Sequence, residues 1–581
     1  MREKKSSSRN QSLMQGALIL TIGAIMVKVI GALFKIPLAG AIKETGMGYF
    51  STAYSIYLPI YVLATAGFPS AIARQISENA ALGRFKDVRK IKQVVSRVLL
   101  TAGIFGTVAM VLAGFIYVNM ANKTNAIYSV ITLAPSILFC CIMSIYRGYY
   151  EGLRNMTPTT ISQIIEALGK LFLGLGMAIG LVYYAEYSFN TTGKFFGKSF
   201  DTAKDAVYAS YPYAAAAAIL GITLGSMLGM IYLMFRYKTV GDGITERELR
   251  NSPQEKEQSQ ILKTLYRIGV PIALGVLVMN VTQLIDTFTI QSRLGHIDEE
   301  KLRGFYNGLI SLENAKGGDV PMYLFGVYNL ALNLFNLIPT ITQALGVSAL
   351  PALAAAWAAK QRDVVQGSIN SVMKITILIS VPCGFGFVAV AGPILELLYP
   401  KNPSGAAIAA PLLTVLGVAV LFNAFLSPIN SMLQAIGKQD TPVKLMLIGA
   451  AIKLALNYTL VGIPEINING APYGTLACYS FIVICSMVIL VRTTGSKVNF
   501  VSVLLKPLIA GALCGIAAFA SYGLISHFMH SRLNVVISIA IAGIVYVISL
   551  FLIKGITKED ILMLPKGEKF AKTLEKLRWI G

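Results

Sequence analysis

Charged side chains are scarce in this 581-residue chain: they make up 13% of it, while hydrophobic residues make up 55%. Soluble domains carry about 25% charged residues, so the composition argues against a soluble enzyme and indicates many membrane spans. Histidine occurs three times, without HExxH or another metal-ligand spacing around it. No Walker motif is present, so ATP is not the expected energy source. We therefore expect no catalytic residue, cofactor or metal, and coupling to the membrane potential or to a monovalent cation.

Acidic residues are outnumbered, with 28 Asp and Glu against 50 Lys and Arg. Apolar runs predict about fourteen transmembrane helices, near residues 13–42, 47–70, 94–118, 125–148, 159–185, 208–235, 265–291, 323–346, 369–399, 405–434, 442–462, 472–491, 502–526 and 533–553. With both termini in the cytoplasm, 34 of the Lys and Arg fall in inside segments or at inner span ends, and 11 in outside loops. The positive charge therefore indicates topology and not a nucleic-acid partner. All six cysteines fall within the predicted spans, so we expect no disulfide framework.

A sequence pattern occurs twice, once in each half of the chain. "GYYEGLRNMTPTTISQIIEALGKLFL" contains Pro158 twelve residues before Lys170, and "SMLQAIGKQDTPVKLMLIGAAIKLAL" contains Pro442 eleven residues before Lys453. Both predicted halves start from the inside, so the pseudo-two-fold axis runs along the membrane normal, as in alternating-access transporters. The predicted organisation is an N-terminal half (1–237), a cytoplasmic linker (238–263), a C-terminal half (264–492), two further helices (493–555) and a cytoplasmic tail (556–581). The fold class is thus an all-α membrane protein with two six-helix halves and two C-terminal helices.

Two lysines lie within the first predicted span, Lys28 near its middle and Lys35 toward its outer end. A lysine at the bilayer centre costs on the order of 3 kcal/mol. Lys28 is too far from either end for its ammonium group to reach water, whereas Lys35, about 10 Å from the outer end, could snorkel. Seven residues are nearly two helical turns, so the two side chains share a face. We expect that face to line a wet cavity and to bind an anion.

Three further predicted spans carry polar residues at helical spacing: Tyr54, Tyr57 and Tyr61 in the second, Asn280, Gln283 and Thr287 in the seventh, and Asn329, Asn333 and Asn336 in the eighth. Facing lipid, these groups would lack hydrogen-bond partners. They indicate either interhelical hydrogen bonds in a packed core or the wall of a polar cavity. Asp286 is the one acid within the seventh span. It is expected to pair with a first-span lysine or to bind a coupling cation.

Smaller patterns predict local features. Glu166 precedes Lys170 by four residues, which favours an ion pair within one helix. Gly221, Gly225 and Gly229 share one helix face and predict close helix packing. Residues 556–581 have the pattern of an amphipathic helix lying on the inner leaflet.

Several stretches together resemble a known superfamily. They are "KVIG" (28–31), "AGFPSAIA" (66–73), "GVPIALGVLVMNVTQLIDT" (269–287), "LGVSALPALA" (345–354), "VPCGFGFVAVAGPILELLYP" (381–400) and "GKQDTPVK" (437–444). The sequence resembles the MOP exporter superfamily and, within it, the bacterial SpoVB/YtgP-type polysaccharide biosynthesis proteins related to MurJ lipid II flippases. In MurJ-type proteins the first-span motif has Arg where this chain has Lys28, and further Arg residues of the second and eighth spans have no counterpart here. The resemblance implies that the first, second, seventh and eighth spans line a central cavity.

These observations together favour a flippase of the bacterial cytoplasmic membrane, with a polyprenyl-diphosphate-linked sugar, lipid II first, as its anionic substrate. The expected ligands are the Lys pair for the diphosphate and the Tyr, Asn and Gln faces for the sugars. Expected partners are membrane phospholipids and cell-wall synthesis enzymes. Open alternatives are a flippase for another lipid-linked saccharide, a cation-coupled multidrug exporter, for which Asp286 is the best support, and a scaffold without transport.

Overall fold

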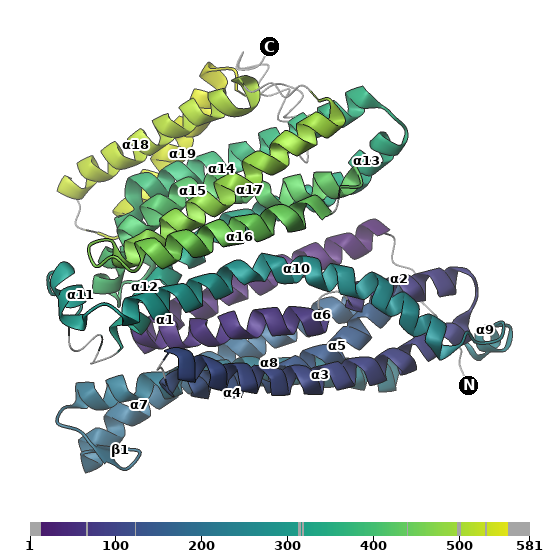
Figure 1. The fold of residues 1–581 in the computed structure, drawn as a ribbon, viewed down its shortest axis with the longest axis horizontal. Helices are drawn as coiled ribbons and strands as arrows, with labels where there is room; N and C mark the ends of the chain where they lie inside the picture. The colour runs from purple at the N-terminus through teal and green to yellow at the C-terminus, as the bar shows by residue number, and fades with distance from the viewer. Residues whose placement is uncertain are drawn as a thin grey trace. The chain divides into compact units, whose positions relative to one another are not determined.

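The structure is a computed structural model that describes residues 13–65, 68–121, 124–311, 315, 319–438, 440–496, 501–528 and 531–555. The expected cytoplasmic lead at 1–12 and the expected amphipathic tail at 556–581 lie outside these residues. Almost every described element is a helix (Figure 1). The described part of the chain has twelve helices long and apolar enough to cross a membrane. The all-α membrane fold is thus confirmed, whereas the count of fourteen stays a prediction.

The difference in count has two sources. Residues 22–63 form one of the twelve candidate spans, but this segment covers most of both of the first two predicted spans, 13–42 and 47–70. Its helix is interrupted at Lys43, whose backbone adopts φ 55° and ψ −172°. The seventh predicted span, residues 265–291, forms a helix but is not among the twelve.

The helices divide into two compact units. The first comprises residues up to 291 together with 311–326, and the second comprises 292–310 and the residues from 327 onward. Elements of the first unit are α1 (Leu13–Thr65), α2 (Phe68–Ala81), α3 (Phe85–Ala121), η1 (Thr124–Ala126), α4 (Ile127–Leu133), α5 (Pro135–Gly152), α6 (Thr157–Gly169), η2 (Lys170–Gly174), α7 (Leu175–Thr192), β1 (Lys194–Phe195), β2 (Lys198–Ser199), α8 (Ala203–Val240), α9 (Glu246–Arg250) and α10 (Gln258–Gly295), whose last turn lies in the second unit. The two short strands pair antiparallel.

The second unit contains the C-terminal helices. Its elements are α11 (Glu299–Phe305), most of α12 (Val320–Phe335), α13 (Leu337–Ala358), α14 (Arg362–Leu398), α15 (Pro403–Ala435), α16 (Asp440–Leu460), η3 (Asn467–Asn469), α17 (Gly470–Thr494), η4 (Val501–Leu505), α18 (Lys506–Phe528) and α19 (Asn534–Leu552). The eighth predicted span is interrupted at Asn336, between α12 and α13. Pro339 follows three residues later, and its ring cannot fit within an uninterrupted helix that donates every N–H.

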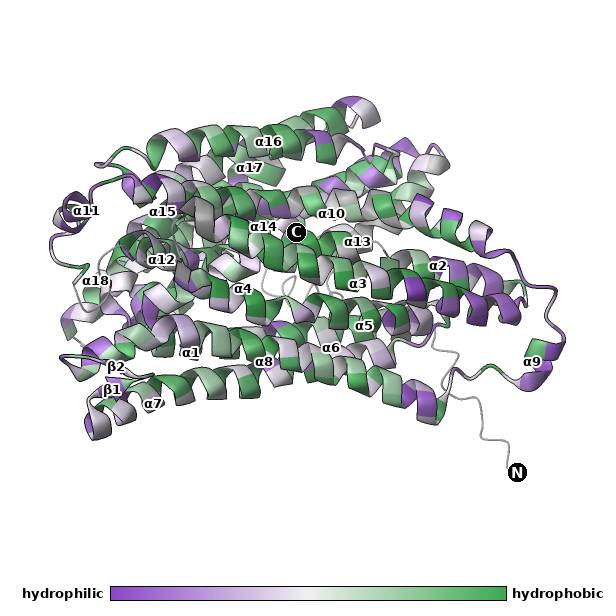
Figure 2. Cartoon of the chain, turned by 60° about the horizontal axis from the view of Figure 1, so that its bottom comes forward, coloured by the Kyte–Doolittle hydropathy of each residue, from purple (hydrophilic) through white to green (hydrophobic). Residues whose placement is uncertain are grey.

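The sequence explains where the helices begin and end. Pro135, Pro158 and Pro403 occupy the first turns of α5, α6 and α15, where a missing N–H costs nothing. Gly193 and Gly495 end α7 and α17 with positive φ angles of 66° and 67°. Figure 2 shows hydrophobic residues along α3 and α8, while hydrophilic ones gather on α9 and at the end of α2. This distribution fits helices whose middle parts lie in hydrocarbon, where polar side chains are costly.

The predicted glycine face of α8 is confirmed. A Cβ on Gly221 would lie 2.1 Å from the backbone nitrogen of Gly174, and a Cβ on Gly225 would lie 2.6 Å from the carbonyl oxygen of Glu166. A Cβ on Gly229 would meet the Met143 sulfur at 3.0 Å. The absence of side chains at these positions of α8 therefore lets α6 and η2 approach it backbone to backbone, which fixes the position of the residues that η2 carries.

The predicted linker is attached to the first unit by polar contacts. Asp242, which follows α8, accepts hydrogen bonds from Arg89 at 3.2 Å and from the Tyr149 hydroxyl at 2.9 Å. Farther along, Asp87 is buried and accepts from the Lys256 backbone N–H at 2.7 Å. The segment from 241 to 257 therefore packs along the ends of α3 and α5. The basic side chain of Arg89 thus holds this segment in place in addition to its contribution to the charge asymmetry.

Candidate functional site

Helix α1 carries five of the predicted ligands. Lys28 is exposed and Lys35 is half-buried, both before the interruption at Lys43. After it come Tyr54, Tyr57 and Tyr61. The Tyr54 and Tyr57 rings lie 5.9 Å apart, edge to face, and the Tyr57 and Tyr61 rings stack at 5.1 Å. The spacing in sequence thus produces a continuous row of three aromatic rings. Their hydroxyl groups can hydrogen-bond a ligand while the rings pack against one another.

The Lys170 side chain lies against this row of aromatic rings, although the sequence favoured a structural role for it, as the ion partner of Glu166. Its ammonium group lies 4.8 Å from the centre of the Phe34 ring and 5.6 Å from that of Tyr54, within range of cation–π attraction. It also experiences the repulsion of Lys35. Lys170 begins η2, a π-helical turn. Such turns are rare and occur frequently at functional sites.

The expected ion pair between Glu166 and Lys170 is wrong. The Glu166 carboxylate pairs instead with the Arg147 guanidinium of α5, at 3.0 Å, and accepts a hydrogen bond from Ser226 of α8 at 3.4 Å. Arg147 also donates to the Ser162 hydroxyl at 2.9 Å. Glu166 still attracts Lys170 electrostatically, but it does not bind it. Sequence spacing could not identify Arg147, because this contact depends on how α5 packs against α6.

We call Lys35, Arg147, Glu166 and Lys170, with the rings of Tyr54, Tyr57 and Tyr61, the first-unit cluster. Tyr61 packs against Cys140 and Met143, and the Met143 sulfur lies 3.5 Å from Arg147. The row of tyrosine rings is therefore connected through Met143 to the ion pair of Arg147 and Glu166. Within this set of four charged residues, three cations and one carboxylate give a formal net charge of two positive charges. In an environment of low dielectric constant, this excess attracts an anion much more strongly than it would in water.

The polar face of the seventh predicted span lies on α10. Asp286 and Thr287 are buried, Asn280 is half-buried and Gln283 is exposed. Beyond this face, Gln291 donates to the Thr52 hydroxyl at 2.7 Å and accepts from Tyr117, which ties α10 to α1 and α3. The proposed roles of Asp286 as a charge partner or cation ligand stay predictions. Among the described residues, no group of three or more His, Cys, Asp or Glu side chains forms a candidate metal site.

The asparagine face of the eighth predicted span belongs to the second unit. Asn329 and Asn333 are half-buried on α12, and Asn336 is exposed at its end. Asn333 lies near the side chain of the buried Tyr399, which follows α14. Whether the three amides meet the same ligand as the first-unit cluster stays a prediction.

Comparisons with known proteins agree with this architecture. Residues 13–192 match the family described as "Polysaccharide biosynthesis protein", and residues 323–459 match the family described as "MatE". The chain is 23% identical to the lipid II flippase MurJ of Bacillus subtilis (strain 168), over 92% of this chain and 94% of that protein. It is 24% identical to stage V sporulation protein B of the same organism, over 96% and 98%. A solved structure of lipid II flippase MurJ, in an inward closed conformation, shares the fold with a TM-score of 0.58, at 14% identity over 92% of this chain and 98% of that one.

Proposed function

We propose that this chain, which is similar to MurJ and to stage V sporulation protein B and matches two transporter-related family models, flips a polyprenyl-diphosphate-linked sugar from the inner to the outer leaflet of the bacterial cytoplasmic membrane. Lipid II is the substrate we propose first. The observation that carries the proposal is the first-unit cluster, which combines a formal excess of positive charge with a row of tyrosine side chains. No bond of the substrate is made or broken, so no catalytic residue is needed.

The energetic cost of this cluster supports a role in binding. Lys28, Lys35 and Lys170 lie within candidate membrane spans, and each lysine at the bilayer centre costs on the order of 3 kcal/mol. Pairing with Glu166 does not offset this cost, because Arg147 already occupies that carboxylate. A diphosphate would neutralise the excess charge, and lysines would hold it as point charges without the geometric demand of an arginine fork.

Transport of such an anion can use the membrane potential. An inside-negative potential favours outward movement of negative charge by about 2.3 kcal/mol per charge per 100 mV. The lysines do not cross with the substrate, so their charge does not cancel this term. Coupling to a monovalent cation through Asp286 is the alternative proposal for the energy source.

A second substrate class is favoured by one specific observation. The match of residues 13–192 to the family described as "Polysaccharide biosynthesis protein" supports another lipid-linked saccharide, which would present the same diphosphate with different sugars. The MatE match keeps a cation-coupled exporter of other compounds as a further alternative, although the excess of positive charge in the first-unit cluster disfavours cationic cargo.

The test is complementation of a flippase-depleted strain, with the leaflet distribution of lipid-linked precursors measured directly. Lys35→Ala, Lys170→Ala and Lys28→Ala should insert at least as well as the parent, because each removes a cost of insertion, yet lose transport. Lys28→Arg should keep substantial activity, whereas Lys28→Glu should be worse than alanine. Full complementation by the Lys35→Ala/Lys170→Ala variant at equal membrane level would refute the proposed diphosphate site.

A further inference from the structure

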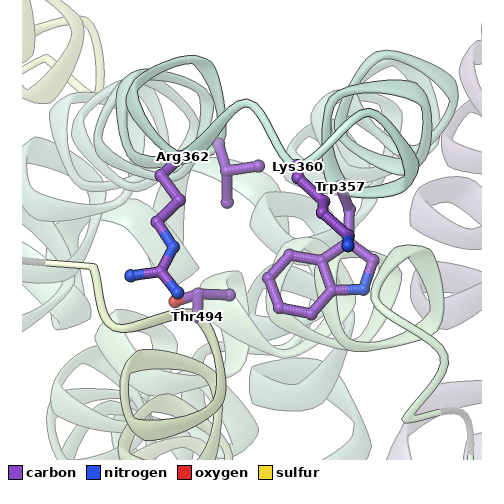
Figure 3. Close-up of a pocket in the computed structure, with 5 residues that line it drawn as sticks. Trp357, Lys360, Arg362 and Thr494 are labelled. Atoms are coloured by element: carbon purple, nitrogen blue, oxygen red, sulfur yellow. The ribbon is translucent and has the colours of Figure 1, made fainter.

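A cavity of about 490 Å³ lies in the second unit, where α13, α14 and the end of α17 meet. Its lining residues are Trp357, Lys360, Arg362, Val365 and Thr494 (Figure 3). The Arg362 side chain extends toward Thr494, while Lys360 and Trp357 lie on the other side. The volume falls within the range of about 300–1,000 Å³ that small-molecule sites occupy.

The cavity carries positive charge that the protein does not neutralise by pairing. No acidic side chain of the described residues forms an ion pair with Lys360 or Arg362. The adjacent acid, Asp363, is exposed in the first turn of α14 and is not part of the lining. The N-terminal N–H groups of α14 add a partial positive charge, because the N-cap residue, Gln361, makes no side-chain cap.

Three properties together suit a lipid headgroup. An arginine fork matches phosphate geometry, and a neighbouring lysine adds a mobile point charge. Trp357 is half-buried, and tryptophan concentrates at the boundary between headgroups and acyl chains. The connection between α13 and α14 and the segment after α17 are both inside segments in the charge-based topology, so the cavity faces the anionic inner leaflet. Basic pockets between transmembrane helices on that side are typical headgroup sites.

We propose that this cavity binds the phosphate of an anionic glycerophospholipid from the cytoplasmic leaflet, with Arg362 and Lys360 on the phosphate and Trp357 against the glycerol and upper acyl chain. This inference does not rest on the proposed transport function, since it concerns residues outside the first-unit cluster. The two proposals can therefore fail separately. Transport could be confirmed while the lipid site is refuted, and the lipid site could be confirmed while the proposed transport substrate is refuted.

The chain offers a direct probe, because it contains two tryptophans, Trp357 and Trp579. In a Trp579→Phe background, fluorescence reports on the cavity alone. The full chain is placed in liposomes containing brominated phosphatidylglycerol or brominated phosphatidylcholine at equal mole fractions, and quenching is measured. The test variant is Lys360→Ala/Arg362→Ala. The matched control is Lys438→Ala/Lys444→Ala, which removes two exposed cations from the α15–α16 region of the same unit.

We expect phosphatidylglycerol to quench Trp357 with an apparent association constant roughly tenfold higher than that of phosphatidylcholine. The preference should vanish in the test variant and persist in the control. Equal quenching by both lipids, or a preference that both variants lose alike, would overturn the proposal. A third arm adds soluble glycerol phosphate. If millimolar glycerol phosphate changes the Trp357 fluorescence while the two lipids quench it equally, the site takes a free phosphate ester and the lipid assignment is wrong.

Discussion

Replacement of Gly221 by alanine tests the backbone contact that positions η2. A Cβ at this position would lie 2.1 Å from the nitrogen and 2.2 Å from the Cα of Gly174. Because real Cβ atoms essentially never come within 3.0 Å of another heavy atom, α8 would have to move away by about 1 Å. The obstructing atoms are backbone, so no side-chain rotation relieves the clash.

The expected magnitude combines two opposing terms. Overpacking of this kind costs about 1–3 kcal/mol, and we expect the upper part of that range against rigid backbone. Alanine returns up to about 1 kcal/mol of helix propensity. The net loss is then about 1–2 kcal/mol, which corresponds to a lowering of Tm by roughly 2–3 °C in a unit of about 300 residues.

The assay is thermal unfolding of the purified, detergent-solubilised chain, followed by fluorescence-detected size exclusion. Gly180→Ala is the matched control, since Gly180 lies on α7 and a Cβ there would meet nothing within 4 Å. The control should be neutral or slightly more stable than the parent. A Tm for Gly221→Ala equal to that of Gly180→Ala would refute the close approach of α8 to η2 and, with it, the placement of Lys170.

Three further outcomes are expected. Arg147→Leu should destabilise the chain by about 1–3 kcal/mol, because it leaves Glu166 without its ion partner at a site 30% exposed, and Arg147→Leu/Glu166→Gln should recover much of that loss in thermal unfolding; no recovery would show that the pair does not determine the effect. Asp286→Asn should change the ion dependence of transport in vesicles, and an unchanged ion response with normal transport would remove Asp286 from the mechanism. In a cysteine-free background, an impermeant maleimide applied to intact cells should label Lys301→Cys but not Arg250→Cys, and the reverse pattern would overturn the topology.

Much of the fold could be predicted because a bilayer imposes long apolar runs. The glycine face of α8 was predictable for the same reason, since helices in lipid gain stability from close contact and not from burial of oily side chains. The partners of Glu166 were not predictable. Spacing of four residues favoured Lys170, but packing of α5 and α8 against α6 brought Arg147 and Ser226 to the carboxylate instead. The π-helical turn that begins at Lys170 had no signal in the sequence either.

Among the candidate ligands, too, contacts within one helix could be predicted from the sequence, whereas contacts between distant segments could not. Helical periodicity grouped Tyr54, Tyr57 and Tyr61 correctly, because their contacts lie within one helix. It could not show that Lys170 lies over the Phe34 and Tyr54 rings, because that contact joins distant segments. Lys28, placed with Lys35 by spacing, is exposed and makes no ion pair with a described residue, so its role as a substrate ligand stays a prediction.

The path of the chain between the compact units has a genetic consequence. The chain leaves the first unit after Gln291, returns at Ser311 and leaves again after Gly326. Three crossings mean that no single cut separates the units into two polypeptides. A gene divided within 238–263 would place α10 on the C-terminal fragment, away from the α1 residue Thr52 that its Gln291 binds at 2.7 Å. Such fragments should accumulate in the membrane only when both are expressed in the same cell.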